Sequence, residues 1–216
     1  MKDSSFDFYE ELADTYHLIF EDWHEAVRWQ GEFFNRFIRS LHDENPEARF
    51  HLLDASCGIG TQALGLARHD FVVTATDLSP KSVERARKEA EKLGIPIDFE
   101  IADFRSLEQD IAGQFDVVLS ADNAIPHLLS DEELRQACRN LYAKLRNEGR
   151  LSCPFGTTTL LFRTASVQRF HESWMKENVW FFKFGTGRKV DFTMYEPIYY
   201  ARNRWSMAYP SQQHIL

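Results

Sequence analysis

The sequence predicts an α/β protein: a doubly wound, mostly parallel Rossmann-like sheet with an N-terminal helical lid and a C-terminal β-hairpin insertion. Short apolar runs alternate with stretches of helical period between residues 51 and 152, the pattern of parallel strands joined by helical crossovers. A turn rich in glycine, Ser56 to Gly60, separates the first apolar run from the first helical stretch. Aromatic residues at helical spacing come before this core, and an alternating stretch comes after it.

These patterns divide the chain into three parts within one domain. Residues 1–45 are expected to form the helical lid and residues 46–154 the Rossmann-like core, with residues 155–216 as a substrate-side C-terminal segment. A polar break around Pro46 marks the entry into the core.

The composition favours a small-molecule partner. The 216 residues include 33 acidic and 25 basic side chains, which gives a formal net charge of −8. An acidic chain is a poor general partner for phosphate backbones, so we expect no nucleic acid partner. No apolar run approaches the roughly 18 residues that a membrane span requires, so we expect no membrane partner. The oligomeric state is left open.

Cysteine and histidine usage argues against disulfides and metal sites. The three cysteines, Cys57, Cys138 and Cys153, lie far apart and include no C-x-x-C pair, and the eight histidines lack ligand spacing. The acidic, polar N-terminus differs from a signal or transit peptide. We therefore expect a cytoplasmic protein without a bound metal.

The first strand and its turn allow two interpretations. Residues 51–54 read as a buried strand, and Thr61 is a plausible N-cap of the helix that follows. Gly58 and Gly60 let the backbone bend sharply and let a ligand approach the main chain. The turn matches the G-x-G-x-x-G/A pattern of dinucleotide-binding proteins. However, Asp54 at the end of the strand gives the pattern D-x-x-x-G-x-G, which favours a different ligand.

Residues 5–41 read as amphipathic helix, rich in aromatic side chains. These rings can simply pack extra helices onto the sheet. Alternatively, they form a lid over a cationic ligand, because aromatic faces attract cations when water is excluded. The candidates for that second function are Tyr16, Trp23 and Arg28.

Acidic residues follow the second and third predicted strands. Asp77 ends the strand at residues 71–77, roughly 20 positions after Asp54, where an acid commonly accepts both ribose hydroxyls. Ser79 is expected to cap a helix that starts at Pro80 and is closed by Gly94.

Asp103 and Phe104 follow the strand at residues 95–101. The carboxylate can accept an exocyclic amine, and the ring can cover an adenine base. The competing interpretation is a turn residue beside a core phenylalanine.

A polar segment, residues 121–128, follows the fourth strand at residues 114–120. Open α/β sheets place their ligands at this end of a strand. Ser130 and Glu133 form a capping box for a helix that we expect to reach Arg146, and a fifth strand begins at Arg150. All the candidate residues would thus gather at one edge of the sheet.

Four segments together resemble class I S-adenosylmethionine-dependent methyltransferases, most closely the glycine/sarcosine N-methyltransferase-like group. The segments are LLDASCGIGTQALGLA, TATDLSPKSVERAR, ADFRSL and FDVVLSADNAIPHLL, within residues 9–152. The resemblance implies S-adenosylmethionine as the cofactor. It implies that Asp54, Ser56, Gly58 and Gly60 hold the methionine end, Asp77 the ribose, and Asp103 and Phe104 the adenine. The neighbouring Ala55, Leu78, Ala121 and Asp122 complete the expected cofactor site.

The same resemblance extends to the N-terminal helix and to the acceptor. The W-x4-R-x-Q run at Trp23, Arg28 and Gln30 resembles the helix with which the group holds its cofactor. Asn123 and His127 are expected near the methionine end of the cofactor or near the acceptor. Asn123 would orient the acceptor or the cofactor carboxylate, and His127 or Asp122 would accept a proton. The expected activity is methyl transfer to a small molecule, most simply to an amine nitrogen.

The C-terminal third departs from the group. Cys153-Pro154-Phe155-Gly156 stands where the group has an Arg-Asx-Tyr-Asp segment, whose arginine can pair with a carboxylate of the acceptor. Residues 178–200 alternate as two antiparallel strands would. This atypical part supports an alternative hypothesis, a non-catalytic methyltransferase-like binding or scaffold protein. A nucleotide-dependent oxidoreductase is a further alternative, which Asp54 and the lack of a Tyr-x-x-x-Lys motif disfavour.

Overall fold

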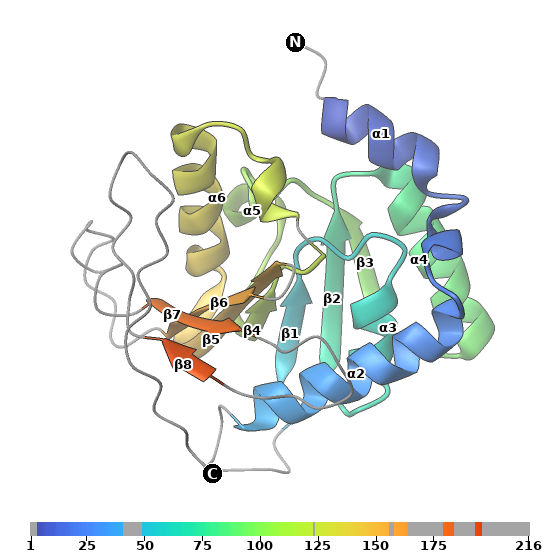
Figure 1. The fold of residues 1–216 in the computed structure, drawn as a ribbon, viewed down its shortest axis with the longest axis horizontal. Coiled ribbons are helices and arrows are strands. Elements are labelled where there is room, and N and C mark those ends of the chain that lie inside the picture. The colour runs from blue at the N-terminus through green and yellow to red at the C-terminus, as the bar shows by residue number, and fades with distance from the viewer. Residues whose placement is uncertain are drawn as a thin grey trace.

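The computed structural model describes residues 4–40, 49–122, 124–155, 158–163, 179–183 and 193–195. They form one sheet in the order β3-β2-β1-β4-β5-β6-β7-β8 (Figure 1). The strands span β1 His51–Asp54, β2 Val72–Asp77, β3 Asp98–Ile101, β4 Phe115–Leu119, β5 Leu145–Phe155, β6 Thr158–Arg163, β7 Val179–Lys183 and β8 Thr193–Tyr195. The strands from β3 to β5 in this order pair in parallel, whereas β6, β7 and β8 add antiparallel pairs.

Helices cover both faces of the parallel part, which confirms the doubly wound fold. In Figure 1, α5 and α6 lie on one side of the sheet, and α2, α3 and α4 lie on the other. The helices span α1 Ser4–Leu12, α2 Trp23–Ser40, α3 Thr61–Ala67, α4 Pro80–Leu93, α5 Leu107–Asp110 and α6 Asp131–Ala143, with the 3₁₀ turns η1 Tyr16–Ile19 and η2 Ile125–His127. No helix in these described ranges is both long and apolar enough to cross a membrane.

Neighbouring residues of β1 belong to two different cores, as the alternation of side chains along a strand requires. Leu52 packs in the cluster that includes Val27 of α2 and Leu64 of α3. Leu53 packs in the other cluster, with Leu107 of α5 and Leu141 of α6. Both leucines are fully buried, so β1 is the centre of the sheet and its carboxyl end is held from both faces.

Two glycines let α2 and α3 approach each other unusually closely. A Cβ atom added to Gly31 would lie 2.6 Å from the Cα of Gly65. A Cβ atom on Gly65 would in turn meet the backbone oxygen of Val27. This close contact fixes the N-terminal helix α2 directly behind the glycine turn that follows β1.

The predicted helix N-caps are confirmed at two of three positions, and Gly94 closes α4 as predicted. The Ser79 hydroxyl accepts the Ser82 N–H (3.1 Å) with Pro80 in the first turn, and the Ser130 hydroxyl accepts the Glu133 N–H (3.2 Å). The prediction for Thr61 is wrong. Gly60 is the N-cap of α3, and Thr61 is the first helical residue.

Other boundaries differ from the sequence-based expectation. The helical stretch expected at residues 5–41 is interrupted between α1 and α2, where only the short turn η1 is helical. The third strand begins at Asp98, after Pro96 rather than before it, and α6 ends at Ala143 instead of Arg146. Strand β5 accordingly starts earlier than expected.

Two of the predicted features fall partly or wholly outside the described residues. β7 and β8 pair antiparallel within the segment predicted as a hairpin, but the expected turn around Gly185 lies outside the described part. The polar break around Pro46 also lies outside it. The three-part division of the chain stays a prediction.

Candidate active site

The glycine turn follows directly from β1. Gly58 has φ +52° and Gly60 has φ +92°, conformations in which L side chains are strained. The N–H of Gly60 donates to the Cys57 carbonyl (2.8 Å), which closes the turn before α3 begins. The backbone from Ala55 to Ile59 consequently lines a pocket at the carboxyl ends of the strands.

Asp77 connects this turn with the start of α4. One of its carboxylate oxygens accepts the N–H of Gly58 (2.8 Å), and the other accepts the N–H of Ser79 (2.9 Å). Burial raises the pKa of Asp77, while these two hydrogen bonds oppose the rise. Each oxygen keeps a lone pair for another donor. The side chain is therefore oriented in advance to receive a ligand with two hydroxyl groups.

Asp54 is a fully buried carboxyl group with an unpaired oxygen. Its Oδ1 accepts the N–H of Ser56 at 3.4 Å, while its Oδ2 has no hydrogen-bond partner among the described residues. Burial, together with the nearby carboxylates of Asp122 and Asp77, raises the pKa of Asp54 to about 8. Buried polar atoms are normally hydrogen-bonded, so this oxygen indicates a missing partner that carries a donor or a positive charge.

Asp103 is held by an arginine of its own turn. Its Oδ1 accepts the backbone N–H of Arg105 (2.8 Å), and its Oδ2 accepts the Arg105 Nε–H (2.7 Å). Arg105 also donates to Glu133 of α6 at 2.9 Å. This chain of contacts fixes the wall of the pocket that Asp103 and Phe104 form.

The turn after β4 contains a strained residue. Asp122 has φ +53°, and its Oδ2 accepts a hydrogen bond from Gln62 (2.8 Å). The same amide nitrogen of Gln62 donates to Gln30 of α2 (2.6 Å). Asp122 is open to solvent on one side, yet the atoms around it raise its pKa through loss of hydration. Strained backbone of this kind is concentrated at functional sites.

Residues from the N-terminal helices complete the wall. Phe6 and Tyr9 of α1 and Tyr16 of η1 line the pocket. The Tyr9 hydroxyl and His127 Nε2 are 2.8 Å apart. Burial and the Asp122 carboxylate raise the pKa of Tyr16 to about 12, so this phenol stays neutral.

The helix α1 is attached to α4 by a charged contact. The Glu10 carboxylate accepts hydrogen bonds from the Ser79 hydroxyl (2.6 Å) and from the Lys81 N–H (3.2 Å). Arg85 adds a hydrogen bond to the Asp14 carbonyl (3.0 Å). These contacts hold α1 across the pocket entrance, so we call Ser4–Leu12 the lid helix.

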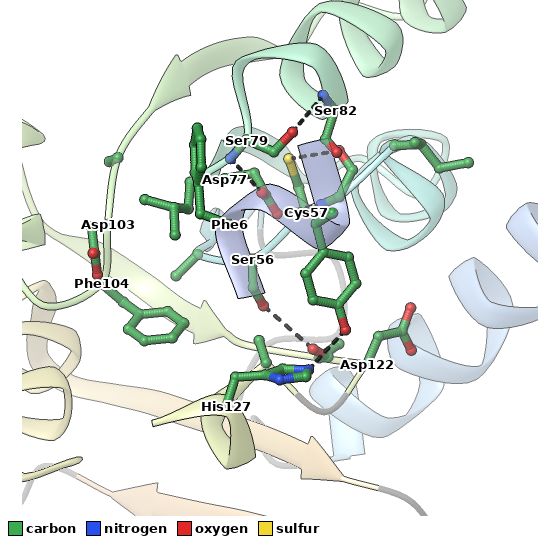
Figure 2. A pocket seen from close by; sticks show the side chains of 18 of the residues that line it. Phe6, Ser56, Cys57, Asp77, Ser79, Ser82, Asp103, Phe104, Asp122 and His127 are labelled. Carbon is green, nitrogen blue, oxygen red and sulfur yellow. Dashed lines mark hydrogen bonds between the residues drawn. The ribbon is translucent and has the colours of Figure 1, made fainter. Parts of the chain in front are cut away.

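Most of the residues predicted for the cofactor share this pocket. Figure 2 shows how Ser56, Asp77, Asp103, Asp122 and His127 surround one space. The predicted residues that line it are Tyr16, Ala55, Ser56, Gly58, Asp77, Leu78, Asp103, Phe104, Ala121, Asp122 and His127. Asn123 lies outside the described residues.

Four predicted residues lie outside the lining. Asp54 and Gly60 are buried behind the glycine turn. Trp23 is also buried, and its indole N–H donates to the Thr61 hydroxyl (2.9 Å), so it supports the first turn of α3 from behind. Arg28 is exposed on α2.

Sequence reasoning missed several lining residues. Phe6 and Tyr9 belong to the stretch that the sequence identifies only as an aromatic-rich helix, and no sequence pattern predicts a role for Arg105. The hydrogen bond between Tyr9 and His127 joins residues 118 positions apart. No local sequence pattern predicts such a contact. The spacing of aromatic residues around Tyr9 is the one feature of the sequence that indicates a role for this helix.

Comparison with known proteins agrees with this geometry. Residues 52–149 match the family described as "Methyltransferase domain". The glycine/sarcosine N-methyltransferase of Parasynechococcus marenigrum is 30% identical over 143 residues, which are 66% of this chain and 48% of that protein. The ubiquinone biosynthesis O-methyltransferase of Caulobacter sp. is 34% identical over 108 residues, which are 50% of this chain and 42% of that protein.

A solved structure supports the fold. The magnesium protoporphyrin IX methyltransferase of Synechocystis, solved with bound S-adenosylmethionine, superposes with a TM-score of 0.56 at 18% identity and covers 82% of this chain and 84% of its own. The present chain spans about half the length of the curated relatives that it matches. The domain match over residues 52–149, the methyltransferase relatives and the shared fold agree with the glycine turn and the acids at the strand ends, and together they support a class I S-adenosylmethionine-dependent methyltransferase.

Proposed function

We propose that this chain binds S-adenosylmethionine in the pocket and transfers its methyl group to a small-molecule acceptor, an amine nitrogen. The observation that carries the proposal is the geometry of Asp77, whose two carboxylate oxygens are held by the Gly58 and Ser79 N–H groups at the end of β2. An oriented carboxylate at this position suits a ribose diol.

The unpaired oxygen of Asp54 fits the other end of the cofactor. The methionine part of S-adenosylmethionine carries an ammonium group and a sulfonium, both positive. A positive group close to the glycine turn would favour the ionised form of Asp54 through its charge and would return the pKa of Asp54 toward the ordinary range. Ser56 and Gly58 provide the backbone and hydroxyl contacts at the same turn.

We assign the adenine to the pocket wall that Asp103 and Phe104 form. Phe104 provides an aromatic face for the base, and Leu78 an apolar one. Arg105 contacts Asp103 Oδ2 through both Nε and Nη2 and donates its backbone N–H to Oδ1, so Oδ1 keeps a lone pair for an exocyclic amine. Arg105 therefore sets the position of Asp103 rather than competing for it.

Bound S-adenosylmethionine supplies an activated methyl group, so the protein mainly has to orient the acceptor and exclude water. Phe6, Tyr9 and Tyr16 of the lid region provide an apolar, aromatic cover over this part of the pocket. Aromatic faces stabilise a cation where water is excluded. On α2, Trp23 and Gln30 act through Thr61 and Gln62, and Arg28 remains a candidate contact.

An amine acceptor suits the charges of the site. The carboxylates of Asp77 and Asp122 stand on the pocket wall, and they favour a neutral or cationic nitrogen over an anionic acceptor. The name of the cyanobacterial relative, glycine/sarcosine N-methyltransferase, points to nitrogen as well. We assign His127 at the pocket rim to the proton of the acceptor, and Asn123 to its orientation.

The test is transfer of a labelled methyl group from S-adenosylmethionine to a panel of small amines, with catechols as the oxygen-acceptor comparison. We expect label in an amine, and a loss of about 10- to 100-fold in kcat/KM for Asp77→Asn, since a charged acceptor of hydrogen bonds is removed. Asp98→Asn, an exposed acid on β3, is the matched control and should leave the rate unchanged.

Two results would contradict parts of this proposal. Label only in a catechol would overturn the assignment to nitrogen and keep the methyltransferase. Tight binding of S-adenosylmethionine with no transfer to any acceptor would favour the binding or scaffold protein instead.

A further inference from the structure

We propose that Tyr9 of the lid helix and His127 of η2 form a proton relay that carries the acceptor's proton out of the closed pocket. The proposal rests on the proposed function, since the proton is the one that a primary or secondary amine loses after it has been methylated. It starts from one contact that links the lid helix with η2, the 2.8 Å hydrogen bond between the Tyr9 hydroxyl and His127 Nε2.

The two partners stand in different surroundings. Tyr9 is half-buried and lines the pocket, whereas His127 is exposed at the rim, on the short turn after β4. Their rings meet edge to face with centroids 5.3 Å apart, so the hydrogen bond is supported by packing. A proton that reaches the imidazole of His127 can therefore pass to solvent, and Tyr9 provides a path to that imidazole from inside the pocket.

The phenol is suited to pass a proton on but not to keep a negative charge. Burial and the facing carboxylates of Asp77 and Asp122 raise the pKa of Tyr9, which keeps its hydroxyl protonated. Tyr9 can then accept a proton only while it gives its own to a neighbour. The neighbour within hydrogen-bond distance is His127.

The proton balance of the step is complete. The lone pair of a neutral amine forms the new N–C bond as the methyl group leaves sulfur, which makes the nitrogen a cation. The cationic nitrogen then loses an N–H proton to the Tyr9 oxygen, while the Tyr9 hydroxyl proton moves to His127 Nε2. The imidazolium finally releases its Nδ1 proton to water, and the pair returns to its starting state after a change of tautomer.

The lid helix places Tyr9 for this step. Glu10, the next residue, is held by the Ser79 hydroxyl and the Lys81 N–H, which fixes the lid helix at the position from which the Tyr9 side chain reaches His127. The relay would thus exist only while the lid helix is closed. Two successive residues therefore connect proton release with closure of the pocket, since Tyr9 passes the proton and Glu10 holds the helix.

The first test compares the wild-type enzyme with Tyr9→Phe, which removes only the hydroxyl and keeps the ring. We expect kcat to fall by about 100-fold, the lower end of the effect of a lost proton transfer, with KM for S-adenosylmethionine within about twofold. Tyr142→Phe, the same change on α6 away from the pocket, is the matched control and should keep the wild-type kcat. Thermal melting of each variant checks the fold.

The second test needs neither cofactor nor turnover. Nitrogen-detected NMR of His127 in the free protein, assigned with His127→Gln, reports the tautomer of the ring. With Tyr9 donating to Nε2, we expect the wild-type ring to carry its proton on Nδ1 and the Tyr9→Phe ring to return to a tautomer mixture. If Tyr9 had only a structural role, the Tyr9→Phe change would not alter both the nitrogen spectrum of His127 and kcat.

The outcomes separate the relay from the proposed function. Wild-type transfer to amines with an unchanged kcat and an unchanged His127 spectrum in Tyr9→Phe would overturn the relay alone. Absence of transfer by the wild-type protein to every acceptor would overturn the proposed function, and the relay with it.

Discussion

Asp54 is the residue whose state depends most on what fills the site. It is buried at the end of the central strand, one of its oxygens has no partner among the described residues, and its pKa is raised to about 8 by burial. In the free protein it is accordingly protonated at neutral pH. A cationic ligand beside it reverses the balance, because the charged form of the acid is then the favoured one.

This reversal predicts that binding of S-adenosylmethionine releases a proton. Below pH 8 the free protein holds the Asp54 proton and the complex does not, so the affinity should rise with pH from 6 to 8, by at most about tenfold per pH unit for one proton. Calorimetric titration in buffers of different ionisation enthalpy measures the release. Asp54→Asn, which cannot lose a proton, is the control.

Equal binding enthalpies in all buffers, with an affinity independent of pH, would show that Asp54 does not change its state. The burial of Asp77 and Asp122 raises their pKa values too, so a release that persists in Asp54→Asn would assign the proton to one of these.

Single residues were predictable from the sequence where a strand ends beside them. Asp77 and Asp103 follow apolar runs directly, and parallel strands bring such positions to one edge of the sheet. The contacts that fix them were not predictable. The hydrogen bonds from Arg105 to Asp103 and from Tyr9 to His127 depend on side-chain directions and on distant parts of the chain.

At the scale of elements, the lid helix is attached to α4 through the side chain of Glu10. Glu10 accepts two hydrogen bonds at the start of α4, whereas Phe8 of the same helix is 57% exposed. Glu10→Ala should thus loosen the helix and raise the dissociation rate of S-adenosylmethionine by about tenfold, as expected for the loss of charge-assisted hydrogen bonds at a partly exposed site.

Stopped-flow fluorescence measures that rate, and hydrogen exchange of residues 4–12 reports the helix itself. Glu11→Ala, the exposed neighbour, is the matched control. Dissociation as slow in Glu10→Ala as in Glu11→Ala would mean that the helix does not cover the bound cofactor.

The contact between α2 and α3 gives a prediction about stability. Gly65→Ala should lower the free energy of unfolding by about 1–3 kcal/mol, because the added Cβ meets the backbone of Val27 and Gly31 and the helices must move apart. Urea denaturation measures the change. Arg36→Ala on the exposed face of α2 should cost no more than about 0.5 kcal/mol. Equal losses in the two variants would contradict close packing at the glycines.

Helices that begin with a recognisable capping residue were predicted well from the sequence. Ser79 with Pro80, and Ser130 with Glu133, start helices where expected, because their caps are local interactions. Thr61 was misassigned because the left-handed Gly60 already serves as the cap, which leaves the Thr61 hydroxyl to accept a hydrogen bond from Trp23. The break between α1 and α2 is a consequence of packing around the pocket, which helical periodicity does not report.

For the molecule as a whole, one arrangement explains the site. The parallel strands from β3 to β5 bring the turns after β1, β2, β3 and β4 to one edge, and the N-terminal helices close the pocket formed there. The parallel pairing of these strands followed from the sequence pattern, whereas their order is known from the structure. The acceptor did not, because folds of this kind choose acceptors through variable covering segments.

The central claim is that this pocket binds S-adenosylmethionine through Asp77. Calorimetric titration with S-adenosylmethionine, its demethylated product and NADH tests it most directly, with wild-type protein and Asp77→Asn side by side. We predict micromolar binding of both adenosyl compounds to the wild type, a loss of about 10- to 100-fold in Asp77→Asn, and no binding of NADH. Equal affinity in both proteins, or binding of NADH alone, would contradict the account.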